Sequence, residues 1–110
     1  MKLYGIANCD TVKAVRKQLD GRDYTFIDFK HTPPAPADIR RWHQALGDRL
    51  VNRQSRTYRE HKAELEAAQA AGEAEWFAAL AAHPLVLKRP IVETEQGVAV
   101  GKNALVELGI

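Results

Sequence analysis

The chain has one residue whose type and position favour covalent chemistry, the single cysteine Cys9. Residues 2–6 predict a short strand through Leu3, Tyr4 and Ile6, and residues 11–19 predict a helix. The thiol therefore lies where a strand ends and a helix begins, and there backbone N–H groups and the helix dipole stabilise an anion. Since the thiolate is the nucleophilic form of cysteine, this position predicts a reactive sulfur. The alternative is a small buried hydrophobic residue, which free cysteine often is.

Three polar residues flank the thiol and are candidate binding residues. Asn8 and Thr11 can hydrogen-bond a sulfur or a bound anion, or they can serve the turn and the helix cap instead. Asp10 or Thr11 is the expected N-cap of the helix. We therefore expect Asn8, Asp10 and Thr11 to line a site around Cys9.

The overall charge gives little reason to expect a nucleic-acid ligand. The formal net charge of the 110-residue chain is only +2, and such a balance does not create the basic surface that nucleic acids require. Basic residues after the first third of the chain could still gather into a positive patch for a smaller anion. They include Arg40, Arg41, Arg49, Arg53, Arg56, Arg59, Lys88, Arg89 and Lys102.

The sequence disfavours membrane proteins and disulfide-stabilised secreted proteins. No apolar run approaches the roughly 20 residues that span a bilayer. Met1 and Lys2 lead directly into the first strand without a signal-peptide pattern. One cysteine cannot form an internal disulfide, so we expect a protein of the reducing cytoplasm.

Neither a metal nor a bound cofactor is expected. The four histidines are isolated from one another and from Cys9 in the sequence, and none has the spacing of a known ligand motif. They are His31, His43, His61 and His83.

The pattern of elements predicts an α/β fold with a mixed sheet. The strand and helix at the N-terminus are followed by an alternating apolar stretch, residues 24–29, which completes a βαβ unit with parallel strands. Near the C-terminus, residues 91–94 and 98–100 flank a Gln96-Gly97 turn and predict a β-hairpin, with residues 103–108 as a last helix.

The middle of the chain predicts helices alone. We expect helices at about residues 37–46, 58–71 and 73–82, separated by a basic loop at 49–56. Trp42 and Trp76 are expected to be core residues of these helices. The whole chain, residues 1–110, is therefore predicted to be a single domain with a helical insert at about 36–82.

A βαβ unit followed by ββα is the element order of the thioredoxin-like fold. In that fold the reactive cysteine follows the first strand, as Cys9 does. A proline before the third strand approaches the cysteine loop, usually through a cis bond, and Pro90 has this position. The alternative for Pro90 is an ordinary proline at a strand start.

Three segments resemble the arsenate reductase (ArsC) and Spx superfamily, in particular its YffB-like branch. They are Leu3-Tyr4-Gly5-Ile6-Ala7-Asn8-Cys9-Asp10-Thr11-Val12-Lys13, then Leu50-Val51-Asn52-Arg53 with Thr57-Tyr58, and Pro84-Leu85-Val86-Leu87-Lys88-Arg89-Pro90-Ile91-Val92. The resemblance implies that Cys9 is a catalytic nucleophile and that Arg89 binds an anion. It also implies that glutathione, with glutaredoxin, completes the cycle.

This chain departs from the arsenate reductases at two of their three arginine positions. Asn52 follows the middle apolar pair, with Arg53 one step later, and Gly101 stands where another arginine is expected, with Lys102 next to it. Arg53 and Lys102 are therefore only candidate anion-binding residues. The resemblance favours a glutathione-dependent thiol-disulfide oxidoreductase acting on a small disulfide or oxyanion, and arsenate reduction is the alternative.

A second alternative is a regulator that binds RNA polymerase, as members of the Spx branch do. Several of those proteins carry a Cys-x-x-Cys switch, but Val12 replaces the second cysteine here, so an internal disulfide switch is excluded. Such a regulator would expose an apolar patch, with the Trp42 and Trp76 helices as the candidates.

Overall fold

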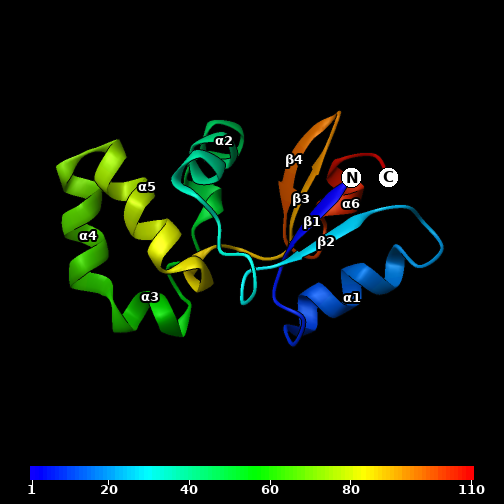
Figure 1. Cartoon of the computed structure of the whole chain (residues 1–110), viewed down its shortest axis with the longest axis horizontal. Helices are drawn as coiled ribbons and strands as arrows, with labels where there is room; N and C mark the ends of the chain where they lie inside the picture. Colours follow the sequence, from blue (N-terminus) through cyan, green and yellow to red (C-terminus); the bar gives the residue numbers. More distant parts are fainter. The chain divides into compact units, whose positions relative to one another are not determined.

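The computed structural model describes all 110 residues and divides into two compact units. Unit 1 comprises Met1–Thr32 and Lys88–Ile110, and unit 2 is the intervening segment Pro33–Leu87. Figure 1 shows the sheet in unit 1, while unit 2 has helices and no strand of the sheet.

Unit 1 is built on a four-stranded mixed sheet in the order β2-β1-β3-β4. The strands are β1 (Lys2–Gly5), β2 (Thr25–Asp28), β3 (Ile91–Thr94) and β4 (Gly97–Val100). β1 is parallel to β2 and antiparallel to β3, and β3 is antiparallel to β4. This is the thioredoxin-like α/β arrangement predicted from the element order, and the β-hairpin is also confirmed.

One face of this sheet is covered by α1 (Asp10–Gln18) and α6 (Ala104–Glu107). The apolar residues of the sheet and of both helices form one buried cluster: Leu3, Val12, Val15, Leu19, Val92, Ala99, Ala104 and Leu105. Gly5 allows α1 to approach β1 closely, because a Cβ atom there would lie 2.7 Å from Cγ2 of Val12. The start of α1 is therefore held directly against the end of β1.

Unit 2 is an all-helical assembly. Its helices are α2 (Pro36–Leu46), α3 (Arg56–Glu60), α4 (Lys62–Ala71) and α5 (Glu73–Ala82), with single 3-10 turns at Gly47–Leu50 and Pro84–Val86. α5 packs against both α2 and α4. A β-bridge between Val51 and Leu87 joins the segments before α3 and after α5.

Both tryptophans are core residues of unit 2, as predicted. Trp42 in α2 is fully buried and Trp76 in α5 is 3% exposed. The apolar patch that a polymerase-binding regulator would expose is therefore not formed by either tryptophan. The only large hydrophobic side chain that is well exposed is Val106 of α6.

Two local predictions were wrong. The single helix expected at 58–71 is two helices, because His61 leaves the helical conformation (φ −116°, ψ 23°) and ends α3 before α4 begins. The N-cap of α1 is Cys9 and not Asp10 or Thr11, because the chain is already helical at Asp10.

None of the helices has the length and apolar character that crossing a membrane requires.

Candidate functional site

Cys9 is the N-cap residue of α1, directly before the first helical residue, Asp10. It has an extended backbone (φ −88°, ψ 126°), and its carbonyl accepts the first helical hydrogen bond, from the N–H of Lys13, at 2.9 Å. The sulfur makes no capping hydrogen bond, so it leaves the N–H groups of the first turn available to an anion. Cys9 is half-buried at the margin of the unit 1 core, and a sulfur there is neither fully enclosed nor fully solvated.

The register of the sheet brings the start of β3 to the end of β1. Tyr4 pairs with Ile91 in the antiparallel β1–β3 ladder. Extending that register by one position sets Pro90 opposite Gly5, four residues before Cys9. The topology therefore places the Arg89-Pro90 dipeptide and the cysteine loop at the same edge of the sheet.

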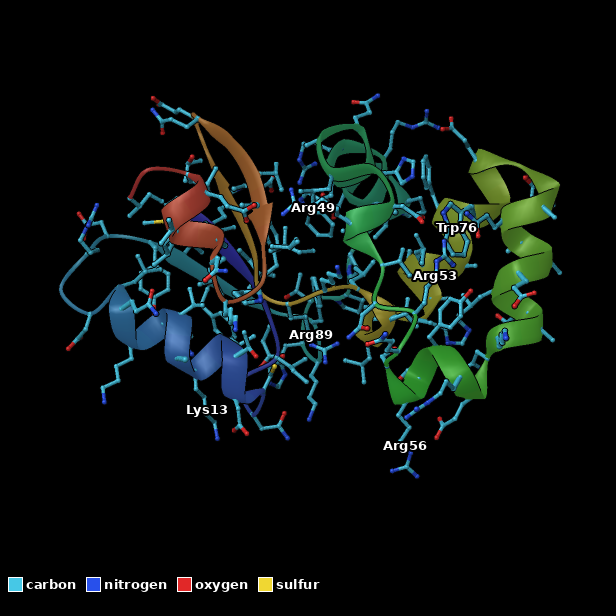
Figure 2. All side chains as sticks on the ribbon, turned by 180° about the vertical axis from the view of Figure 1, so that it is seen from behind. Lys13, Arg49, Arg53, Arg56, Trp76 and Arg89 are labelled. Carbon is cyan, nitrogen blue, oxygen red and sulfur yellow. The ribbon has the colours of Figure 1, made fainter.

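Arg89 and Pro90 have the local structure that the fold resemblance predicted. The peptide bond between them is cis. Arg89 is half-buried and its Nε is screened from solvent, and the residue leads directly into β3 (Figure 2). The planar guanidinium group of arginine suits a carboxylate or an oxyanion.

Gly101 and Lys102 reach the same edge through β4. The N–H of Gly101 donates to the carbonyl of Pro90 at 2.9 Å, immediately after the Ile91–Val100 pair. Gly101 has φ +86°, a left-handed conformation that favours glycine over any residue with a side chain. An arginine at 101 would be strained, and the exposed Lys102 is the cation that this turn supplies instead.

The polar neighbours of Cys9 differ in exposure. Asn8 and Asp10 are exposed, whereas Thr11 is half-buried in the first turn of α1. The carboxylate of Asp10 interacts favourably with the helix N-terminus but repels a second anion there. Of the three, Asn8 and Thr11 therefore suit an anionic ligand better than Asp10 does.

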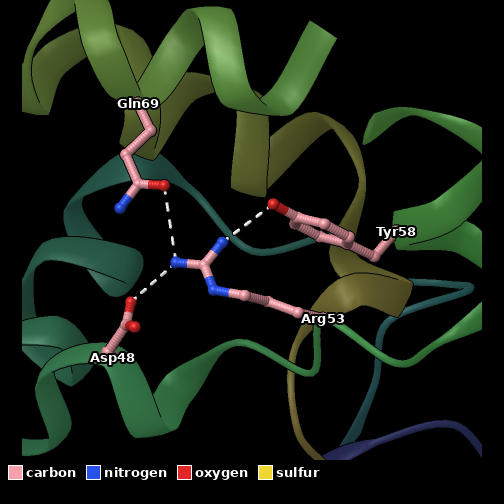
Figure 3. A network of polar contacts seen from close by, with 4 residues as sticks. All are labelled: Asp48, Arg53, Tyr58 and Gln69. Carbon is pink, nitrogen blue, oxygen red and sulfur yellow. Dashed lines mark hydrogen bonds and ion pairs between the residues drawn. The ribbon is translucent and has the colours of Figure 1, made fainter. Parts of the chain in front are cut away.

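Arg53 belongs to unit 2, where it is the centre of a polar network (Figure 3). It donates to Asp48 and to the hydroxyl of Tyr58, both at 2.8 Å, and to Gln69 at 3.4 Å. Its guanidinium also lies over the ring of Trp76, at 5.8 Å from the centroid (Figure 2). Burial lowers the pKa of Arg53, but the hydrogen bonds and charges of Asp48 and Tyr58 outweigh burial and raise it above its ordinary value. These contacts use both terminal nitrogens, so they support a structural role for a residue that the sequence suggested for anion binding.

A basic hollow on α1 was not predicted. It has a volume of about 330 Å³ and is lined by Lys13, Arg16, Lys17, Asp20 and Tyr24. Arg16 is fixed there, since its Nε donates to the Tyr24 hydroxyl at 3.0 Å and its guanidinium lies 4.0 Å from the centroid of Phe26. The i, i+3, i+4 spacing of Lys13, Arg16 and Lys17 was the sequence signal for this shared helix face.

A second cluster that the sequence did not predict joins residues far apart in unit 2. The rings of His61 and His83 stack with centroids 4.2 Å apart, and Nε2 of His83 lies 2.8 Å from Oε2 of Glu64. Their separation in the sequence gave no signal of this contact, which depends on how α4 and α5 pack.

Fold and site together define a thioredoxin-like protein with a cysteine at the N-cap of its first helix. The model of the ArsC family matches residues 4–105, so the chain belongs to the ArsC family. No curated protein gave a significant sequence match.

Solved structures of the family are similar over almost the whole chain. The YffB protein is 33% identical with a TM-score of 0.82, over 97% of this chain and 96% of its own. A possible arsenate reductase from Streptococcus mutans is 27% identical with a TM-score of 0.77, over 99% and 97%. An arsenate reductase from Vibrio cholerae shares the fold, with 24% identity and a TM-score of 0.79 over 100% and 98%.

Proposed function

We propose that this chain is a glutathione-dependent thiol-disulfide oxidoreductase with Cys9 as its nucleophile. The observation that carries the proposal is the position of Cys9 as the half-buried N-cap of α1, with its sulfur outside any capping hydrogen bond. A helix N-terminus favours an anion at this position. Membership of the ArsC family, whose solved members include a possible arsenate reductase, supports thiol-dependent reduction.

The proposed cycle uses one cysteine and two glutathione molecules. The Cys9 thiolate attacks one sulfur of a small disulfide, forming a mixed disulfide and releasing the other half as a thiol after it takes up a proton. A glutathione thiolate then attacks the Cys9 sulfur, releasing the second half and leaving Cys9 joined to glutathione. A second glutathione attacks the bound glutathione sulfur, which restores the Cys9 thiolate and yields glutathione disulfide. The substrate disulfide gains two electrons and two glutathione molecules lose them.

Arg89 is proposed to bind the carboxylate of glutathione or an oxyanion. Its support is the β1–β3 register, which brings residue 89 to the edge of the sheet where the cysteine loop begins. Lys102 is proposed as a weaker, exposed cation of the same edge, on the support of the hydrogen bond between Gly101 and Pro90.

A disulfide substrate is favoured over arsenate by the state of the other two arginine positions. Gly101 has a left-handed backbone that disfavours an arginine, and Arg53 donates to Asp48, Tyr58 and Gln69. A tetrahedral oxyanion with several negative oxygens is best bound by several cations, whereas a neutral disulfide does not need them.

The test measures glutathione oxidation with cystine as the substrate. We expect turnover by the wild-type chain, the uncatalysed rate with Cys9→Ser, and a raised KM for glutathione with Arg89→Ala. Mass spectrometry of the wild type after treatment with glutathione disulfide should show one added glutathione on Cys9. Arg56→Ala is the matched control, because Arg56 is 88% exposed and extends away from the ribbon (Figure 2).

Two results would count against the proposal. If Cys9→Ser retains the wild-type rate, Cys9 is not the nucleophile. If turnover depends on Cys9 but is faster with arsenate than with cystine, the thiol chemistry stands and the disulfide substrate is wrong.

A further inference from the structure

We propose that His61, Glu64 and His83 form a binding site for one zinc ion in unit 2. Each residue offers one ligand atom, and these three atoms all lie within 4.8 Å of one another. Nδ1 of His61 lies 3.9 Å from Oε1 of Glu64, and Nε2 of His83 lies 2.8 Å from the other carboxylate oxygen. Two imidazoles and one carboxylate form a known set of three protein ligands for zinc, with the fourth position left to water.

The geometry requires only small side-chain movements to bind a metal. In a tetrahedral site with bonds of about 2.0–2.1 Å, neighbouring ligand atoms lie roughly 3.3 Å apart. The carboxylate of Glu64 already lies 2.8 Å from Nε2 of His83 and 3.9 Å from Nδ1 of His61, so the main remaining change is a movement of the His61 ring toward it. Partial exposure of the three side chains, 38% for His61, 57% for Glu64 and 20% for His83, gives the ion an entry path and room for water.

The backbone holds the three ligands at the open end of a helical hairpin. α4 and α5 pack against each other and are joined at Gly72. Glu64 is in the first turn of α4, His61 immediately precedes that helix, and His83 is the C-cap of α5. The partial negative charge at the C-terminus of α5 favours a cation beside His83.

The chemistry of the three side chains favours a bound metal ion over two stacked imidazole rings without one. Only one of the two imidazoles has the carboxylate at hydrogen-bond distance, and the other lies face to face with a second titratable ring. Imidazole and carboxylate donors suit zinc and its neighbours in the transition series better than they suit magnesium or calcium. The neighbouring charges Arg56 with Glu60, and Lys62 with Glu66, are paired among themselves and leave Glu64 to the histidines.

A bound ion would close the hairpin at the end opposite Gly72. Because the unfolded chain does not present the three ligands together, metal binding is linked to folding and stabilises the unit that contains the site. The expected effect of this site is therefore on the stability of the fold, whereas the thiol site in unit 1 is proposed to catalyse a reaction.

The test is calorimetric titration of the full chain with zinc alone, in a Cys9→Ser background that removes the thiol as a competing ligand. We expect one zinc per chain, a higher thermal midpoint with zinc, and a loss of affinity of about tenfold or more in His61→Ala, Glu64→Gln and His83→Ala. His31→Ala is the matched control, because His31 is an exposed histidine of unit 1, and it should bind as the background does.

Cobalt(II) supplies a second readout that does not depend on activity. A visible absorption spectrum typical of nitrogen and oxygen ligands should appear in the Cys9→Ser background and disappear with His83→Ala. The proposal is overturned if zinc does not bind the background protein. It is also overturned if zinc binds the doubly substituted His61→Ala, His83→Ala chain as tightly as it binds the background.

Discussion

Arg53 has a different role in the structure from the anion-binding role that the sequence suggested. In the sequence it stands one step from an arginine position of the arsenate reductases. In the structure its guanidinium donates to three side chains and lies over two rings, those of Tyr58 and Trp76. Its partners Asp48, Tyr58 and Gln69 come from three different segments of unit 2. No local pattern could have predicted this convergence, because it depends on tertiary packing.

We therefore expect Arg53→Met to destabilise the fold by about 1–3 kcal/mol, since it removes charge-assisted hydrogen bonds and a cation–π contact. Urea unfolding measures the change. Arg53→Lys should restore little of the loss, because an ammonium cannot reproduce the planar fork of the guanidinium.

The matched control for Arg53 is Arg56→Met. Arg56 makes one exposed i, i+4 pair with Glu60 at 2.9 Å, so its removal should change stability by about 0.5 kcal/mol or less. Equal effects of the two substitutions would contradict the structural role of Arg53. A raised KM with unchanged stability in Arg53→Met would instead favour the anion-binding role suggested by the sequence.

At the scale of elements, the position of Cys9 depends on how closely α1 approaches β1. Gly5→Ala places a Cβ atom 2.7 Å from Cγ2 of Val12, which is fully buried in the unit 1 core. We expect this overpacking to cost about 1–3 kcal/mol and to slow the alkylation of Cys9, because α1 must move. Chemical denaturation and iodoacetamide labelling measure the two effects.

A compensating substitution tests the cause of the Gly5 effect. Val12→Ala alone leaves a cavity and destabilises the core, but in the Gly5→Ala background it removes the clashing methyl group. The double variant should therefore be more stable than the sum of the two single changes predicts. Additive losses would show that the close approach of Gly5 and Val12 is not the cause.

Helix α3 depends on a single side-chain cap. The hydroxyl of Ser55 accepts a hydrogen bond from the N–H of Tyr58 at 3.1 Å. We expect Ser55→Ala to cost about 1 kcal/mol in thermal or urea unfolding. Asn103→Ala is the control, because Asn103 is the N-cap of α6 but makes no capping hydrogen bond with its side chain. A loss as large for Asn103 as for Ser55 would contradict this reading of the cap.

Most elements could be predicted from the sequence because their signals are local. The four strands, the helices at α1, α2 and α5, and the hairpin turn at Gly97 follow apolar periodicity, glycine positions and turn residues. The break at His61 could not be predicted, because residues 58–71 are rich in alanine and glutamate, which favour one continuous helix. That break also places His61 beside His83, so the unpredicted element boundary and the unpredicted cluster have the same origin.

At the scale of the molecule, the candidate site follows from topology more than from any single motif. The sheet order β2-β1-β3-β4 brings the end of β1, the start of β3 and the end of β4 to one edge. The element order suggested the thioredoxin-like fold, which grouped Cys9 with Pro90, and the resemblance to the ArsC family added Arg89. From the sequence, Gly101 was only a departure from the arginine that the arsenate reductases have at this position. Its left-handed backbone explains why an arginine is disfavoured there.

The single-domain prediction is tested by cooperativity of unfolding. Each unit holds about half of the chain, and segments of roughly 60 residues bury too little surface to be more than marginally stable alone. We therefore expect one transition. Tryptophan fluorescence, which reports unit 2, and labelling of Cys9, which reports unit 1, should give the same midpoint in urea. Two separate midpoints would show that the units unfold independently and that the chain is not one cooperative domain.

The insertion of unit 2 between the halves of unit 1 has a consequence during synthesis on the ribosome. β1 and β2 are made first, but β1 is an inner strand, and its second partner β3 follows only after all of Pro33–Leu87. Until then, the side of β1 that pairs with β3 has no hydrogen-bonded partner strand. The apolar face of α1 also lacks its packing partners Val92, Ala99 and α6. Unit 2 is continuous in the sequence and leaves the ribosome before β3 does, so contacts within unit 2 can begin to form before the sheet of unit 1 is complete.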